Sequence, residues 1–182
     1  MEENISRRSN FLDAGFGTGQ TAAFLSKSFR CSAIALDKHP VMIQKANQRF
    51  FNEQLPIKAI QGNVENLPFP DDTFDFVLSE SVAAFTNIAV SLTEFCRVLK
   101  PGGVLFMIEM TAEKPLQPSE LNDIKRVYGI SKVLLEKEWI HQLNLSGFSE
   151  AAAIFSNTVE SELQKDSQQE DDYPEYQISG PR

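Results

Sequence analysis

The sequence has little cysteine and no long apolar run. Its two cysteines, Cys31 and Cys96, lie far apart, with no Cys-x-x-Cys pair and no nearby histidine. This spacing suggests neither a disulfide framework nor a zinc site, so we expect buried free thiols and no metal. No stretch approaches the ~18 apolar residues of a membrane span, and residues 1–10 lack the apolar stretch of a signal peptide. We therefore expect a cytoplasmic protein without a membrane partner.

Basic residues are also scarce. Seventeen lysines and arginines stand against 25 aspartates and glutamates, which gives a formal net charge of -8. A field of this sign repels a phosphate backbone, so we expect no nucleic-acid partner. The acidity is concentrated at one end, since residues 160–182 hold seven acids and two bases and contribute -5 of the total. We expect one domain over residues 1–159, followed by an acidic tail that has too few apolar residues to order itself.

Short apolar runs alternate with longer amphipathic stretches along residues 1–159. This alternation is typical of strands joined by crossover helices. We expect strands at 10–13, 31–36, 57–61, 74–79, 104–109 and 151–155, with a short seventh at 176–178. We expect helices at 20–28, 40–52, 88–99, 120–128 and 132–145. The pattern predicts an α/β fold with a single doubly wound, mostly parallel, Rossmann-like sheet, helices on both faces, and room for one antiparallel edge strand.

A glycine-rich loop follows the first expected strand. Residues 13–19 read Asp-Ala-Gly-Phe-Gly-Thr-Gly, so Gly15, Gly17 and Gly19 lie between a strand and a helix. Ligands of doubly wound sheets bind beyond the carboxyl ends of the strands, and glycines let the backbone come close to them. A tight turn without any ligand would use the same residues. Gln20 stands where a dinucleotide fingerprint has its third glycine, which weakens but does not exclude a nicotinamide cofactor.

An acid ends the second expected strand. Asp37 lies 18 residues beyond Gly19, where a carboxylate can accept hydrogen bonds from both hydroxyls of a ribose. Taken alone, an aspartate here would more simply cap the helix that begins near Pro40. Taken with the glycine loop, Asp37 predicts a site that binds a ribose and repels a 2′-phosphate.

Two further motifs complete an ordered set between residues 10 and 110. Residues 62–75 read Gly-Asn-Val-Glu-Asn-Leu-Pro-Phe-Pro-Asp-Asp-Thr-Phe-Asp, and residues 94–103 read Glu-Phe-Cys-Arg-Val-Leu-Lys-Pro-Gly-Gly. Together with the glycine loop and Asp37, they resemble the class I S-adenosylmethionine-dependent methyltransferases, in the type 11-like branch that includes quinone and sterol methyltransferases. The resemblance implies a transferase that moves a methyl group from S-adenosylmethionine to a small-molecule acceptor by direct displacement.

The resemblance also assigns positions to the cofactor. These positions are Asp13, Gly15, Gly17, Gly19, Asp37, Lys38, Asn63, Val64 and Ser79. Asp13 would orient the methionine amino group, directly or through water, while the Gly15 and Gly17 backbone would line the methionine moiety. The Ser79 carbonyl would reach the same end, and Asp37 would hold the ribose.

The adenine end departs from the family pattern. Asn63 would meet the adenine amine, with the Val64 N–H on a ring nitrogen. The family often has aspartate at the first position, and the Asn63 amide oxygen accepts a hydrogen bond without a charge, so we expect modestly weaker binding. Lys38 replaces an apolar residue, and its methylene stem would have to cover the adenine. Residues 83–87 lack the histidine pair of the quinone branch, so that branch's substrate is not implied.

The chemistry itself requires no obligatory catalytic residue. A sulfonium is already an activated leaving group, so positioning and desolvation can supply most of the acceleration. A base is needed only where the acceptor must lose a proton, and the strand-end candidates are Glu80, Glu109 and His39. The two glutamates are also explained as solvated or capping residues, and His39 as part of the turn before Pro40.

About ten residues precede the first expected strand, whereas the family usually has several tens that cover the cofactor. We therefore expect a shortened N-terminal cap, with an acceptor pocket that is open or is closed by a partner or by a second copy in a homodimer. Two alternatives to the methyltransferase stay open. One is a nicotinamide-dependent oxidoreductase on a similar sheet, and the other is a noncatalytic cofactor-binding subunit that needs a partner.

Overall fold

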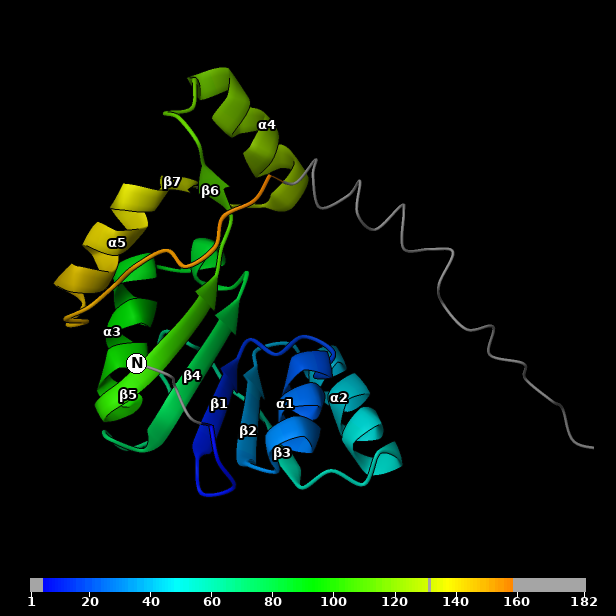
Figure 1. The fold of residues 1–182 in the computed structure, drawn as a ribbon. Coiled ribbons are helices and arrows are strands. Elements are labelled where there is room, and N and C mark those ends of the chain that lie inside the picture. Colours follow the sequence, from blue (N-terminus) through cyan, green and yellow to red (C-terminus); the bar gives the residue numbers. More distant parts are fainter. Residues whose placement is uncertain (1–4, 131, 159–182) are drawn as a thin grey trace, which may run out of the picture. The chain divides into compact units, whose positions relative to one another are not determined.

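The computed structural model describes residues 5–130 and 132–158 of the 182-residue chain. Its central sheet has five strands. They are β1 (Asn10–Ala14), β2 (Ser32–Asp37), β3 (Ile57–Gln61), β4 (Phe74–Glu80) and β5 (Leu99–Ile108). Neighbouring strands pair in parallel in the order β3-β2-β1-β4-β5 (Figure 1). The chain starts in the middle of the sheet and extends to both edges, which confirms the predicted doubly wound α/β fold.

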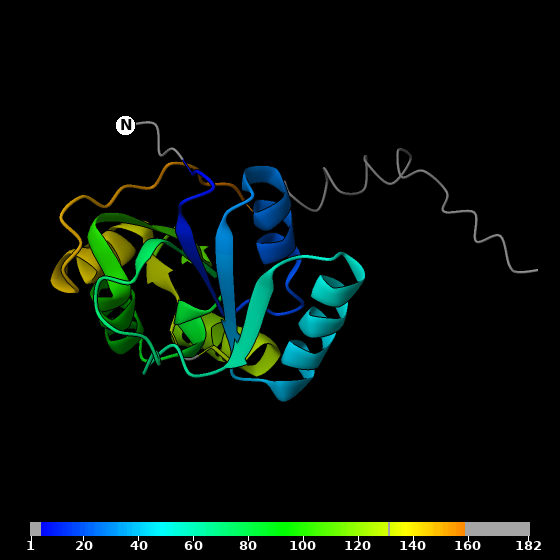
Figure 2. The same cartoon turned by 90° about the horizontal axis from the view of Figure 1, so that it is seen from below.

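Helices cover both faces of this sheet (Figure 2). They are α1 (Gln20–Phe29), α2 (Pro40–Asn52), α3 (Ile88–Val98) and α5 (Glu136–Leu145). Phe11 packs in a core cluster with residues of α1 and α2, whereas its neighbour Leu12 packs in a second cluster with residues of α3. Adjacent residues of a strand point to opposite faces, so one apolar run supplies both cores. Cys31 is buried in the first cluster as expected, whereas Cys96 is only half-buried.

A small region follows β5. It contains β6 (Thr111–Ala112), α4 (Pro118–Tyr128) and β7 (Leu134–Leu135), and β6 pairs in parallel with β7. Leu134 and Trp139 form a third cluster with Ala83 and Ala84, which belong to the short 3₁₀ helix η1 (Ala83–Phe85) after β4. This cluster fixes the region to the carboxyl end of β4. In the two described stretches, no helix combines the length and apolarity needed to cross a bilayer.

The expected strand at Ala151–Phe155 is wrong. Residues 151–158 contain neither helix nor strand, and Ile154 and Phe155 are 90% and 75% exposed. A short apolar run does not distinguish a strand from an irregular segment, because a strand also needs a hydrogen-bonded neighbour. The antiparallel edge strand that the sequence allowed is absent from the described part of the chain. The expected strand at 176–178 and the tail at 160–182 lie outside it.

Two expected boundaries also differ. The helix expected at 132–145 begins only at Glu136, because Leu134 is buried in the third cluster. The Leu135 N–H donates to the Glu138 carboxylate at 2.8 Å, which caps the helix there. At the other boundary, β5 begins directly after α3, five residues before the expected start at 104, because Leu99 already pairs with Phe74.

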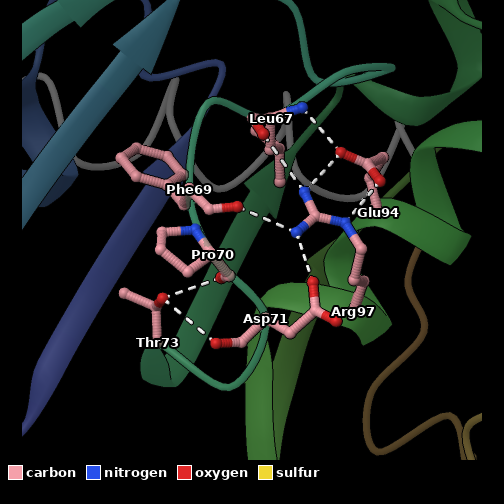
Figure 3. A network of polar contacts seen from close by, with 7 residues as sticks. All are labelled: Leu67, Phe69, Pro70, Asp71, Thr73, Glu94 and Arg97. Carbon is pink, nitrogen blue, oxygen red and sulfur yellow. Dashed lines mark hydrogen bonds and ion pairs between the residues drawn. The ribbon is translucent and has the colours of Figure 1, made fainter.

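Arg97 joins the two motifs at residues 62–75 and 94–103 (Figure 3). Its guanidinium donates to both oxygens of Glu94, at 2.7 and 2.8 Å. It also donates to the carbonyls of Leu67 and Phe69, at 3.1 and 2.8 Å. A fifth hydrogen bond reaches Asp71 at 2.8 Å, so all five donors of the guanidinium are used. Helix α3 thus anchors the loop that connects β3 to β4.

Candidate functional site

The glycine loop leaves the carboxyl end of β1 and is fixed by the Leu36 carbonyl, which accepts the Gly15 N–H at 2.7 Å. Gly15 and Gly19 satisfy the requirements of a tight turn, because both have positive φ and an added Cβ would overlap Val82 or the Phe50 ring. Gly17 also has a φ of 55°, but an added Cβ there would meet nothing within 4 Å. The Gly17 backbone therefore borders open space, which a ligand can occupy.

Asp37 connects this loop to the end of β2. One carboxylate oxygen accepts the Gly17 N–H at 3.0 Å, and the other accepts the His39 N–H at 2.8 Å. The side chain is only 8% exposed. The His39 carbonyl in turn accepts the Met42 N–H at the start of α2, so Asp37 also stabilises the helix entry. A carboxylate has about four acceptor positions, and the two remaining ones match the two hydroxyls of a ribose.

Asp13 is the most perturbed acid of the site. It is 3% exposed, and one carboxylate oxygen, Oδ2, is buried without a hydrogen-bond partner among the described residues. The pKa of Asp13 is raised to about 7, first by burial and then by the negative charges of Glu80 and Asp37, while the Ala22 N–H opposes the rise. An unpaired buried oxygen of this kind fits a donor that is supplied by a ligand.

Glu80 is a third carboxylate at the same edge. It ends β4 and accepts a hydrogen bond from the Thr21 hydroxyl of α1 at 3.3 Å. In the described stretches, no lysine or arginine forms an ion pair with Asp13, Asp37 or Glu80. No group of three or more His, Cys, Asp or Glu side chains there is placed to hold a metal ion. The arrangement suits an organic cation.

The residues expected at the adenine end differ in exposure, and two of them already form hydrogen bonds within the protein. Val64 is buried, as a residue under a ring would be. The Asn63 side chain is exposed, and its amide oxygen accepts the Glu65 N–H at 3.0 Å, so part of its acceptor capacity is used within its own loop. Lys38 is exposed, and its carbonyl accepts the Gln61 side-chain amide at 3.1 Å. Lys38 follows the end of β2, and Asn63 follows the end of β3.

The three candidate bases have different surroundings. One oxygen of Glu109 accepts the Val82 and Ala83 N–H groups, at 3.0 and 2.8 Å, which makes this residue a cap for η1. Burial raises the pKa of Glu109, and those N–H groups oppose the rise. His39 is exposed, whereas Glu80 is half-buried beside Asp13. Of the three candidate bases, Glu80 is therefore the one that lies with Asp13 and Asp37 at the carboxyl ends of the strands.

Ser79 and the aromatic residues Phe16, Phe85 and Trp139 differ in how deeply they are buried. Ser79 is fully buried, and its hydroxyl has no partner among the described residues. Phe16 and Trp139 are buried in core clusters, whereas Phe85, in η1 after β4, is 49% exposed. Sequence reasoning missed Thr21. The sequence gives only a weak signal for Thr21, because threonine is common in the first turn of a helix and does not by itself indicate a functional role.

A separate hollow of about 230 Å³ lies in the region after β5. It is lined by residues of that region, including Leu116, Leu121, Val133 and Leu135. None of the residues expected to bind a cofactor contributes to it. The chemistry-bearing side chains gather instead at the carboxyl ends of β1, β2 and β4, where a ligand of a doubly wound sheet is expected.

Two family models match the chain. The methyltransferase domain model matches residues 12–107, and the model described as Anamorsin, N-terminal, matches residues 61–180. The uncharacterized methyltransferase YodH of Bacillus subtilis (strain 168) is 44% identical over 143 residues, which cover 79% of this chain and 61% of that protein. A demethylmenaquinone methyltransferase of Chlorobaculum tepidum is 35% identical over 104 residues, which cover 57% of this chain and 41% of that protein.

The fold is similar to a solved methyltransferase structure. It is phosphoethanolamine N-methyltransferase 2 of Haemonchus contortus in complex with S-adenosyl-L-methionine. The TM-score is 0.80 at 18% identity, over 93% of this chain and 40% of that one. At this identity the similarity concerns the fold alone. The chain thus spans 61% or less of the length of each of these three proteins.

Proposed function

Because the chain belongs to the methyltransferase domain family, as the match over residues 12–107 shows, we propose that it transfers a methyl group from S-adenosylmethionine to a small-molecule acceptor. The observation that carries this proposal is the buried, unpartnered oxygen of Asp13. It lies in a group of carboxylates that has no basic ion-pair partner in the described stretches, beside a glycine whose Cβ position is open. A ligand with a positive charge and hydrogen-bond donors fits these features.

The residues at the strand ends fit the parts of this cofactor. Asp13 would accept from the methionine ammonium, together with the Ser79 carbonyl. Asp37 would accept from the ribose hydroxyls through its two remaining acceptor positions. The Gly15, Gly17 and Gly19 loop would border the methionine moiety.

The adenine would lie over Val64, and the Val64 N–H would reach a ring nitrogen. Asn63 would give a weaker contact than an aspartate, because its amide is neutral and its oxygen already accepts the Glu65 N–H. The Lys38 stem would cover the adenine from the β2 side. These assignments place the ring next to the loop that Arg97 anchors, so stable folding of that loop supports cofactor binding.

The cofactor supplies an activated methyl group on a sulfonium, and the protein's part is to bind, orient and exclude water. Where the acceptor must lose a proton, we propose Glu80 or His39 as the base in preference to Glu109, whose carboxylate is used as a cap. A net charge of -8 supports a small molecule over a nucleic acid as acceptor. The expected cytoplasmic location, the 1–159 domain with its 160–182 tail, and a homodimer or partner that closes the pocket stay predictions.

The test has two steps. Titration calorimetry with S-adenosylmethionine and with NAD compares the two cofactor classes, and we expect heat from the first alone. Incubation of the full chain with S-adenosylmethionine and a metabolite mixture should then yield a product heavier by about 14 Da, the mass of the added CH₂. Binding of NAD without S-adenosylmethionine would contradict the proposal. Tight cofactor binding without any product would favour the noncatalytic subunit.

A further inference from the structure

We propose that Glu109 is a positioning residue for the cofactor site, because its carboxylate holds the turn after β4 in contact with the glycine loop. This inference rests on the proposed function and deepens it. The sequence suggests Glu109 as a base, whereas its contacts indicate that it shapes the cofactor site through a neighbouring residue.

The turn after β4 has a backbone conformation that needs support. Ser81 has a φ of 54°, which lies in the left-handed region that is unfavourable for a residue with a side chain. Its N–H donates to the Ile108 carbonyl of β5 at 2.8 Å. The next two N–H groups, of Val82 and Ala83, donate to one oxygen of the Glu109 carboxylate, at 3.0 and 2.8 Å. The end of β5 therefore determines the path of the chain between β4 and η1.

This turn brings the side chain of Val82 to the glycine loop. A Cβ added to Gly15 would overlap both methyl groups of Val82, so the valine packs directly against the Gly15 backbone. The pairing of β1 with β4 ends at Asp13 and Leu78, and β1 itself ends at Ala14. On the β4 side, the loop is therefore bordered by the Val82 side chain rather than by a paired strand.

The glycine loop is thus fixed from two sides. On the β2 side, the Leu36 carbonyl accepts the Gly15 N–H at 2.7 Å. On the β4 side, the contact with Val82 depends on the Glu109 carboxylate, which holds the Val82 N–H. A loop that is ordered before the ligand arrives loses less conformational entropy on binding. Loss of the Glu109 carboxylate should therefore weaken cofactor binding, although Glu109 is not assigned a contact with the cofactor.

The test is the dissociation constant of S-adenosylmethionine, measured by titration calorimetry on the folded full chain. Glu109→Ala removes the acceptor of both N–H groups and should weaken binding roughly tenfold. Glu109→Gln keeps one acceptor oxygen and should restore the affinity to within about threefold of the wild type. The matched control is Glu120→Ala. Glu120 caps α4 by accepting the Gln117 N–H at 2.7 Å, so its loss should lower the stability of the fold and leave the dissociation constant unchanged.

A second variant tests the route through Val82. Val82→Ala removes the methyl groups that pack against Gly15 and should weaken binding roughly three- to fivefold. Because Glu109 acts through Val82, Glu109→Ala should cost less affinity in the Val82→Ala chain than in the wild type. Losses that simply add in the double variant would overturn this route. Should Glu109→Ala not fold, unchanged affinity in Val82→Ala would overturn the inference by itself.

The remaining outcomes separate the possible failures. Wild-type affinity in folded Glu109→Ala overturns the positioning role of Glu109 and leaves the proposed function intact. An equal loss of affinity in Glu109→Ala and Glu120→Ala overturns it as well, because general destabilisation would then explain both. A wild-type chain that does not bind S-adenosylmethionine overturns the proposed function and this inference together.

Discussion

The backbone N–H of Gly17 donates a hydrogen bond of 3.0 Å to the Asp37 carboxylate. This contact ties the glycine loop after β1 to the end of β2, so the two features that the sequence offered separately form one unit. Asp37 also receives the His39 N–H at 2.8 Å. The carboxylate is therefore oriented before any ligand arrives, and an oriented acceptor loses less conformational entropy on binding.

Asp37→Ala should weaken S-adenosylmethionine binding by about 1.5–3 kcal/mol, the usual contribution of hydrogen bonds to a charged group. Titration calorimetry on the folded variant measures this loss. Asp37→Asn is the matched control, because it keeps one acceptor oxygen and should lose less than the alanine variant. An unchanged affinity in folded Asp37→Ala would refute the ribose assignment.

Gly17→Ala and Gly19→Ala should separate binding from folding. Both glycines have positive φ, which costs an alanine about 1–2 kcal/mol. At Gly17 the new methyl group meets no protein atom within 4 Å, so we expect that modest loss of stability together with a large loss of cofactor affinity. At Gly19 the methyl group would lie 2.7 Å from the Phe50 ring, so the loss of stability should be larger. Chemical unfolding measures the stability of each variant, and calorimetry measures its cofactor affinity. Two variants with the same stability and the same loss of affinity would contradict these expectations.

Asp13 should make the unliganded protein less stable as the pH rises. Its folded-state pKa of about 7 lies above the ordinary value of 3.8, so the folded chain holds a proton that the unfolded chain has lost. The stabilising effect is complete below about pH 4 and disappears as the pH passes 7, with an upper limit of roughly 4 kcal/mol. Urea unfolding between about pH 4.5 and about pH 8 measures the slope. Asp13→Asn should flatten it, and an identical slope in the variant would contradict the burial of a protonated carboxyl.

Arg97→Lys should destabilise the fold by about 2–4 kcal/mol, although it keeps the charge. A lysine has three donors and no planar fork, so it cannot replace the five hydrogen bonds to Glu94, Asp71 and the Leu67 and Phe69 carbonyls. Arg126→Lys is the control, because its pair with Asp123 on α4 is exposed and should contribute less than about 1 kcal/mol. Thermal unfolding of the two variants gives the comparison. Equal melting temperatures would show that the network in Figure 3 does not stabilise the loop.

Much of the fold could be predicted from the sequence, because alternating strand and helix periods define a parallel sheet. Four strands and the glycine loop lie close to where that pattern placed them, and β5 begins five residues earlier than expected. The errors at Ala151–Phe155 and at the start of α5 concern short apolar segments, for which tertiary contacts decide the conformation. The positions of Asp13 and Asp37 at the carboxyl ends of neighbouring strands were predictable, because spacing along the chain fixes them, whereas their roles toward a cofactor stay predictions. The cap by Glu109 and the Thr21–Glu80 hydrogen bond depend on residues brought together by folding, and no local pattern encodes them.

A crystal structure of the full chain with S-adenosylhomocysteine tests the central claim most directly. We predict that both ribose hydroxyls lie within about 3.2 Å of the Asp37 carboxylate. We also predict that the amino group of the methionine moiety lies close to Asp13 Oδ2, directly or through one water, at the carboxyl ends of β1, β2 and β4. A ligand bound in the hollow after β5, or bound without contact to Asp13 and Asp37, would contradict the account.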